Sequence, residues 1–119
     1  MDAVREPFNV NSLAQVAATA ALQDRAFVQR TRAMVCAGRR VLVRELERLG
    51  YEVIPSVTNF LLIKIGPAAS TIAQRLLAQG VIVREMRAWK LVGCLRVTIG
   101  TTSENRRFLQ ALHHALQRR

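Results

Sequence analysis

The sequence predicts an α+β fold with a small, mixed or antiparallel sheet of about four strands, covered by helices mainly on one face. Three observations support this prediction. A long amphipathic helical pattern, from residue 24 to about residue 49, precedes the sheet. Short apolar runs with strand periodicity follow it. A helical pattern then separates the second run from the third, so that residues 59–84 have the β-α-β form found in α/β proteins.

Residues 1–23 are predicted to form an interface arm and an apolar helix. Pro7 blocks helix formation, and the segment around it shows no periodicity. Ser12 is expected to cap the helix, with Gln15 in the capping-box position. The body of the helix, residues 13–22, is apolar nearly all round, which is typical of a helix that packs against another chain or domain.

Residues 24–119 are predicted to form a single domain that begins with the long helix. Asp24 is the expected N-cap, and Gly50 is expected to end the helix. Gly38 costs about 1 kcal/mol relative to Ala, which indicates a bend or the close approach of another element. The predicted apolar stripe comprises Phe27, Met34, Val35, Val41, Leu42, Leu46 and Leu49, and the solvated side Arg32, Arg39, Arg40, Glu47 and Arg48.

The runs with strand character are residues 51–54, 59–65, 81–84 and 93–100. The second is apolar on both faces, as a central strand would be. Between the second and third runs, Ser70 or Thr71 is expected to cap a helix that ends near Gln79. The last helix is expected to begin at residues 101–104 and to bury Phe108, Leu109, Leu112 and Leu116.

The run 93–100 carries Arg96 at its centre. Alternation places Leu95, Val97 and Ile99 on one face and Cys94, Arg96 and Thr98 on the other. The guanidinium therefore stands between two small side chains, which leaves room for a planar anion such as a carboxylate. The alternative is an ion pair with one of the protein's own acids.

The net charge of +10 fits a nucleic-acid-binding protein, but the pattern of the charges does not favour that function. Sixteen of the eighteen basic residues are Arg, and they are spread along the whole chain. A solvated basic face is the better interpretation. Cys36 and Cys94 lie in apolar segments without Cys-x-x-Cys spacing, and no apolar run approaches the ~18 residues of a membrane span. We therefore expect a folded cytoplasmic protein with reduced thiols.

The sequence contains residues suited to anion binding but no familiar catalytic grouping. It lacks a nucleophile with a nearby base, metal-ligand spacing and a Gly-rich phosphate loop. His113 and His114, near the end of the last helix, are expected on the surface. Arg84 and Asn59 join Arg96 as candidate binding residues, although Arg84 also fits an exposed strand end and Asn59 a turn.

Four motifs occur in order along the chain: REPFNVNSLAQ at 5–15, PSVTNFLL at 55–62, GVIVR at 80–84 and GCLRVTIGTTSEN at 93–105. Together they resemble the C-terminal third of the histidinol-phosphate aminotransferase family, which belongs to the fold-type I enzymes that use pyridoxal phosphate. The resemblance covers essentially the whole chain. It implies the fold of an aminotransferase small domain, with the long helix joining it to a large domain.

The resemblance also implies roles for individual residues. Arg96 would bind the carboxylate or other charged end of the substrate, Arg84 would lie at its phosphate end, and Asn59 would lie beside Arg96. The rim of the active site at a homodimer interface would comprise Pro7, Phe8, Asn9 and Asn11. The reaction would transfer an amino group between glutamate and a phosphorylated amino substrate in histidine biosynthesis, with pyridoxal 5'-phosphate as cofactor.

The cofactor lysine of the family lies in the large domain, and neither Lys64 nor Lys90 stands in a matching motif. The chain alone is therefore expected to bind no cofactor and to be inactive. The loop 85–92 also lacks the glycine and proline common in the family. One alternative is a threonine-phosphate decarboxylase-like enzyme of the same fold, which Arg96 would serve equally well.

Two alternatives fall outside the enzyme class. A free-standing nucleic-acid-binding module would need aromatic side chains on the exposed strands, where only Phe60 is available. A structural or dimerising fragment would use the apolar helix at residues 13–22 as its contact surface. The substrate-clamping domain of an aminotransferase remains the prediction that accounts for most of the chain.

Overall fold

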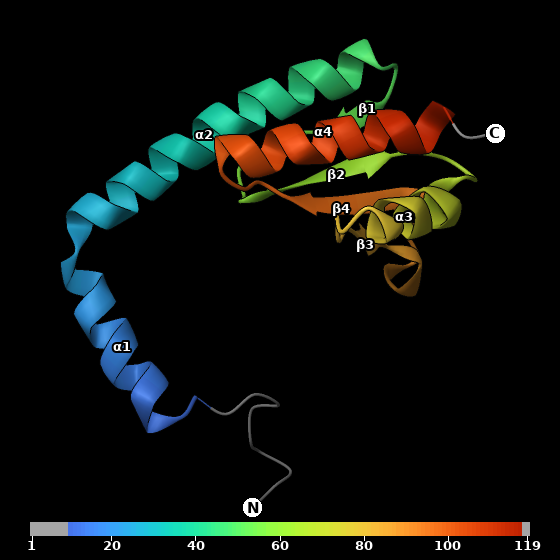
Figure 1. Ribbon diagram of the computed structural model, residues 1–119. Helices are drawn as coiled ribbons and strands as arrows, with labels where there is room; N and C mark the ends of the chain where they lie inside the picture. The colour runs from blue at the N-terminus through green and yellow to red at the C-terminus, as the bar shows by residue number, and fades with distance from the viewer. Residues whose placement is uncertain (1–9, 118–119) are drawn as a thin grey trace, which may run out of the picture. The chain divides into compact units, whose positions relative to one another are not determined.

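The computed structural model describes residues 10–117 (Figure 1). The helices are α1 (Ser12–Gln23), α2 (Arg25–Arg48), α3 (Ala69–Ala78), the short 3₁₀ helix η2 (Arg87–Trp89) and α4 (Thr102–Gln117). The strands are β1 (Glu52–Ile54), β2 (Phe60–Lys64), β3 (Arg84–Glu85) and β4 (Cys94–Thr98). The chain divides into two compact units, residues 1–32 and 33–119. Within residues 10–117, no helix is long and apolar enough to cross a membrane.

In the described part of the chain, the strands form one sheet in the order β1-β2-β4-β3. Every pairing is antiparallel, so the sheet is of the antiparallel kind that the sequence left open. Since β2 and β3 both run antiparallel to β4, they are parallel to each other with β4 between them. The predicted β-α-β crossover at residues 59–84 therefore passes over one intervening strand.

One face of the sheet is covered by helices, as predicted (Figure 1). Leu61 and Ile63 of β2 lie opposite Val97 and Leu95 of β4, and all four side chains are buried. They pack with apolar side chains of α2, α3 and α4, namely Leu42, Leu46, Ala69, Ile72, Leu76, Phe108, Ala111, Leu112 and Ala115. The alternate residues of the same strands project to the opposite face of the sheet, and Arg96 is one of them.

The starts of two helices differ from the predictions. Asn11, not Ser12, is the N-cap of α1, because its Oδ1 accepts a hydrogen bond of 2.8 Å from the amide of Ala14. The side chain of Gln15 donates to the carbonyl of Val10 and so completes no capping box. Helix α3 begins at Ala69 without a side-chain cap, since the hydroxyl of Ser70 instead donates to Glu85 at 2.5 Å.

The predicted strand at residues 81–84 is mostly absent. The amide of Val81 donates to the carbonyl of Leu76 at 2.9 Å, which ties the chain to the end of α3. The segment therefore joins the sheet only at Arg84, and β3 comprises Arg84 and Glu85 alone. Ile82 is 84% exposed as a consequence.

Helix α2 follows its predicted bounds, and Asp24 caps it by accepting from the amide of Phe27 at 2.8 Å. The predicted apolar stripe is only partly buried. Leu42 and Leu46 are fully enclosed, whereas Phe27, Met34 and Val41 are exposed. The predicted solvated side also needs a correction at Arg39, which is half-buried and donates through Nη2 to the carbonyl of Thr58. The buried positions of the stripe, Leu42 and Leu46, are one turn apart in the C-terminal half of the helix.

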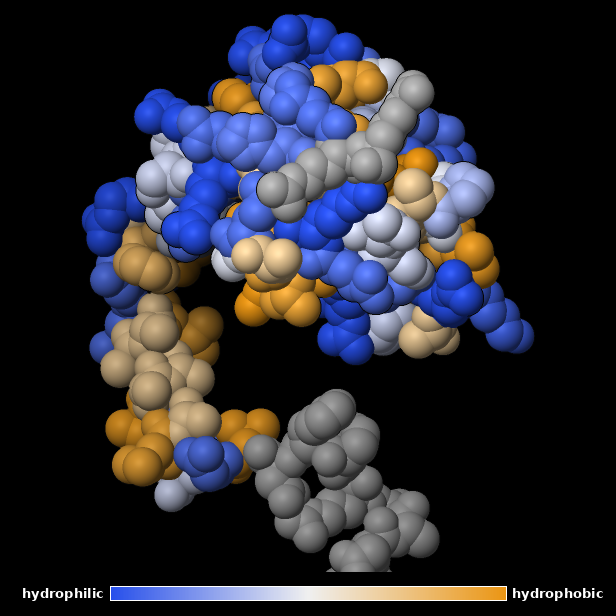
Figure 2. All heavy atoms as spheres, turned by 45° about the vertical axis from the view of Figure 1, so that its right-hand side comes forward, coloured by the Kyte–Doolittle hydropathy of each residue, from blue (hydrophilic) through white to orange (hydrophobic). Residues whose placement is uncertain are grey.

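Every residue of α1 is exposed, and its surface is mostly apolar on the side that Figure 2 shows. Leu13 and Leu22, near the two ends of this helix, are 81% and 80% exposed. This agrees with the prediction of a helix without a polar face. Cys36 and Cys94 are free thiols.

Candidate functional site

The face of the sheet opposite the helices brings two arginines together. Arg96, at the centre of β4, lies directly opposite Arg84 of β3 in the strand register. Directly paired residues of antiparallel strands project to the same face, with Cβ atoms about 5 Å apart. Two guanidinium groups from different parts of the chain therefore share one side of the sheet.

A depression of about 430 Å³ lies at these two arginines. Its remaining lining comes from Thr98 of β4 and from Ile82 and Val83. The depression exists because the chain before β3 does not continue the pairing with β4. Because residues 82 and 83 do not pair with β4, a space remains beside the C-terminal end of β4.

An aromatic ring backs each arginine. The guanidinium carbon of Arg96 lies 5.3 Å from the centroid of the Phe60 ring. The guanidinium carbon of Arg84 lies 4.5 Å from the centroid of the Trp89 ring. Both distances are within the range of a cation–π interaction. A ring against one face of a guanidinium leaves the N–H groups at its edge available to a ligand.

No carboxylate in residues 10–117 forms an ion pair with Arg84 or Arg96; the ion pairs found there use other basic residues. Glu85, the neighbour of Arg84, lies opposite Leu95 and so projects to the helical face. There its Oε1 accepts from Ser70 and pairs with Arg87 at 3.4 Å. The two arginines thus present uncompensated positive charge, which favours the binding of an anion.

The other predicted site residues lie elsewhere or outside the described range. Asn59 is exposed just before β2, its carbonyl accepts from the amide of Ile99 at 2.8 Å, and it does not line the depression. Pro7, Phe8 and Asn9 lie outside the described residues. Asn11 is the N-cap of α1. The structure therefore groups Arg84 with Arg96 at one depression, while Asn59 lies next to the end of β4 without lining that depression.

Three further residues of the site were not identified from the sequence. Thr98 shares the face of Arg96 by simple alternation, and this signal was available. Phe60 was noted as the aromatic available on the exposed strands, but its position against Arg96 depends on strand order, and the position of Trp89 against Arg84 depends on the loop conformation. Trp89 is the last residue of η2 and follows Arg84 by five residues in the sequence.

Neither lysine of the chain suits a cofactor that bonds to a lysine side chain. Lys64 Nζ forms an ion pair with Glu52 at 2.6 Å on the exposed sheet face. Lys90 is exposed in a left-handed turn after η2. Neither lines the depression at the arginines. Neither lysine is therefore placed to bond to pyridoxal phosphate at this site.

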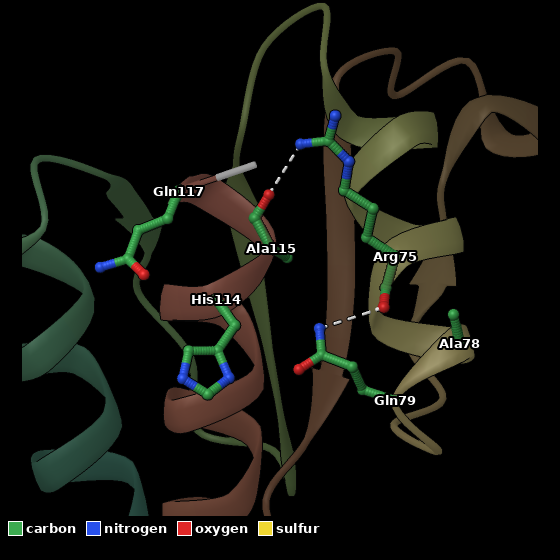
Figure 3. A pocket seen from close by; sticks show the side chains of 6 residues that line it. All are labelled: Arg75, Ala78, Gln79, His114, Ala115 and Gln117. Atoms are coloured by element: carbon green, nitrogen blue, oxygen red, sulfur yellow. Dashed lines mark hydrogen bonds between the residues drawn. The ribbon is translucent and has the colours of Figure 1, made fainter. Parts of the chain in front are cut away.

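A second depression, of about 380 Å³, lies between α3 and α4 (Figure 3). Here Arg75 Nη1 donates to the carbonyl of Ala115 at 2.8 Å. The Gln79 amide donates to the carbonyls of Arg75 and Ala111, both at 3.2 Å. These bonds satisfy carbonyls of the two helices and join them. Arg75 and Gln79 thus have a structural role in this depression. His113 and His114 are exposed on α4, as predicted.

Comparison with known proteins places the chain in a family. The model of the family "Aminotransferase class I and II" matches residues 1–112, and the chain belongs to this family. Histidinol-phosphate aminotransferase from Methylobacillus flagellatus is 48% identical over 119 residues, which is all of this chain and 32% of that protein. Histidinol-phosphate aminotransferase 1 from Nitrosococcus oceani is 45% identical and is matched by 98% of this chain.

Among solved structures, the chain resembles histidinol-phosphate aminotransferase from Sinorhizobium meliloti in complex with pyridoxal-5'-phosphate. The TM-score is 0.81 at 26% identity, covering 98% of this chain and 33% of that one. The fold is therefore that of the corresponding third of such aminotransferases, as the sequence motifs predicted. The chain spans about a third of the length of the curated relatives it matches.

Proposed function

We propose that this chain is the C-terminal, substrate-clamping domain of a histidinol-phosphate aminotransferase. Arg84 and Arg96 bind the charged groups of the phosphorylated amino substrate and of glutamate or 2-oxoglutarate. The observation that carries the proposal is the pair of ring-backed guanidinium groups in one depression, without an ion-pair partner among residues 10–117. The names of the relatives support the choice of substrate.

Each arginine has a defined task in this proposal. A guanidinium offers parallel N–H donors that match two oxygens of a carboxylate or phosphate. Arg96 stands in the middle of a strand with neighbours on both sides, so its backbone is held firmly. Arg84 lies on the edge strand and completes the clamp from the side. The domain thereby orients the substrate for chemistry performed elsewhere in the enzyme.

Several parts of the proposal concern the complete enzyme. Pyridoxal phosphate supplies the electron sink for amino-group transfer, and residues outside this chain hold it. The enzyme is a cytoplasmic homodimer, and Asn11 together with Pro7, Phe8 and Asn9 lies at the rim of the active site in the dimer interface. Asn59 supports the carboxylate end of the substrate near Arg96. The chain alone retains no stoichiometric pyridoxal phosphate after dialysis.

The test is a chimera in which this chain replaces the matching third of the Methylobacillus flagellatus protein, to which it aligns over its whole length. We expect aminotransfer between histidinol phosphate and 2-oxoglutarate. Arg96→Gln and Arg84→Gln should each lower kcat/KM on the order of 10- to 100-fold, because each removes charged hydrogen bonds to the substrate.

Arg87→Gln is the matched control, since it removes the same charge from a nearby exposed position that does not line the depression. Its kcat/KM should stay within about two-fold of the unmodified chimera, a change of well under 1 kcal/mol. Equal kcat/KM values for the Arg84, Arg96 and Arg87 variants would contradict the proposal. Activity with threonine phosphate and none with histidinol phosphate would replace it with the decarboxylase alternative.

A further inference from the structure

Among the described residues, the ring of Trp89 contacts the guanidinium of Arg84, which forms no hydrogen bond or ion pair with them. Arg84 is exposed, at the start of a strand of two residues, and directly opposite another arginine. Like charges at directly opposed strand positions repel each other. Without a restraint, the long side chain of Arg84 would turn away from Arg96 into solvent. The indole face, 4.5 Å from the guanidinium carbon, opposes this movement.

The backbone at Trp89 is itself held by hydrogen bonds. Its amide donates to the carbonyl of Met86 at 3.0 Å, and the amide of Leu91 donates to the same carbonyl at 3.3 Å. Met86 is buried, and its amide donates to Cys94 of β4 at 3.1 Å. The loop is thus anchored to the strand that carries Arg96. The indole therefore holds Arg84 at a defined place relative to that strand.

We propose that Trp89 is a positioning residue that keeps Arg84 beside Arg96 and thereby gives the site its preference for phosphate over carboxylate. This inference rests on the proposed function of the two arginines. A phosphate group presents three oxygens and close to two negative charges at neutral pH, so both guanidinium groups can bind it together. A carboxylate, with two oxygens and one charge, is satisfied by Arg96 alone. Loss of the Trp89 contact should therefore weaken the binding of phosphate and leave the binding of a carboxylate unchanged.

The experiment measures binding of inorganic phosphate and of acetate to the 119-residue chain by calorimetry at constant ionic strength. Trp89→Leu removes the aromatic face, whereas Trp89→Phe keeps one. We expect Trp89→Leu to weaken phosphate binding about two- to five-fold and to leave acetate binding unchanged. Trp89→Phe should remain within about two-fold of the wild-type affinity for phosphate. Circular dichroism of both variants checks that the fold is retained.

A second measurement does not depend on substituting Trp89. Trp89 is the only tryptophan in the sequence, so its fluorescence reports on its own contacts. Arg84→Gln should change the emission and abolish its response to phosphate, while Arg87→Gln should leave both as in the wild type. Equal emission spectra for these two variants would show that the stacking contact is absent in solution and would overturn the inference.

The failure of the inference and that of the proposed function give different results. If phosphate binding depends on Arg84 and Arg96 but Trp89→Leu binds as the wild type does, the positioning role is wrong and the anion clamp stands. If Arg84→Gln and Arg96→Gln bind phosphate as tightly as Arg87→Gln does, or if the wild type binds none, the clamp itself is wrong. In that case the role of Trp89 is overturned with it.

Discussion

The side chain of Asn105 binds both polar groups of the Gly100 backbone. Its Oδ1 accepts from the Gly100 amide at 2.9 Å, and its Nδ2 donates to the Gly100 carbonyl at 2.9 Å. Asn105 is the one buried polar or charged residue in the part of the chain that the structure describes. It joins the first turn of α4 to the end of β4, the strand that carries Arg96. The chain just after β4 is therefore held against α4 by this pair of bonds.

Asn105→Ala should destabilise the domain by about 2 kcal/mol, because it leaves a donor and an acceptor of Gly100 without partners in a partly buried place. The measurement is urea unfolding of the chain. Gln110→Ala, at an exposed position of the same helix, is the control and should change stability by less than about 0.5 kcal/mol. Equal unfolding midpoints for the two variants would show that the pair of bonds contributes nothing.

Gly38→Ala should also destabilise the domain, although Ala is the better helix former by about 1 kcal/mol. A Cβ atom at Gly38 would lie 2.8 Å from Asn105 Nδ2 and 2.8 Å from Ile99 Cγ2. Relieving such contacts costs about 1–3 kcal/mol, so we expect a net loss of about 1 kcal/mol in the free energy of unfolding. The close approach predicted from Gly38 in the sequence is thus confirmed by its neighbours.

The exposed neighbour Ala37 provides the comparison for this prediction. Ala37→Gly should cost about 1 kcal/mol through backbone propensity alone. Both exchanges between Gly and Ala should therefore destabilise α2, although propensity by itself gives them opposite signs. A Gly38→Ala variant that gains about 1 kcal/mol of stability would mean that α4 does not approach α2 as closely as the structure shows.

Periodicity was enough to predict most of the local elements of this chain, but not the extent of β3. The bounds of α2 follow from its amphipathic pattern, and the two faces of β4 follow from alternation, which placed Arg96 away from the core. Capping was predicted less well: Asn11 and Ser12 are adjacent and chemically suited to the same position, and only the backbone geometry selects Asn11. Val81 likewise continues an apolar run, but its bond to the end of α3 keeps it out of the sheet.

The site depends on contacts that the sequence does not encode locally. Arg84 and Arg96 were each identified as anion-binding candidates, but their direct opposition requires the strand order β1-β2-β4-β3. The stacking of Trp89 on Arg84 requires the conformation of the 3₁₀ turn between β3 and β4. Prediction therefore identified both arginines, while the depression between them and the rings behind them became visible only in three dimensions.

The stability of the chain should depend on the ionisation of Glu104. Hydrogen bonds from the amide and the hydroxyl of Thr101, both at 2.7 Å, lower the pKa of Glu104 below its ordinary value of 4.5. Because the folded-state pKa is the lower one, ionised Glu104 contributes stability above about pH 4.5, and this contribution is lost as the pH falls through the folded-state pKa. Acid should therefore loosen the start of α4.

The measurement is the free energy of unfolding of the wild type and of Glu104→Gln between pH 7 and pH 3. We expect the wild type to be the more stable at pH 7 and the two curves to converge towards pH 3. Glu47→Gln, at an exposed position of α2, is the control and should not show this convergence. A constant difference between wild type and Glu104→Gln over the whole range would rule out the contribution of the Thr101 contacts.

Arg84→Gln removes the like-charge pair that Arg84 forms with Arg96 across the strands, and it also removes the contact of Arg84 with the Trp89 ring. Opposed like charges cost a few tenths to about 1 kcal/mol, and added salt screens them. The Tm of the variant relative to that of the wild type should therefore be higher at low ionic strength than in 0.5 M sodium chloride. Phosphate should lower this relative Tm, since a ligand that binds only the folded wild type raises the Tm of the wild type by mass action. Arg40→Gln, an exposed arginine of α2, is the control and should show no phosphate-dependent difference. A relative Tm of Arg84→Gln that does not fall with added salt would mean that the two arginines do not repel each other in the folded chain.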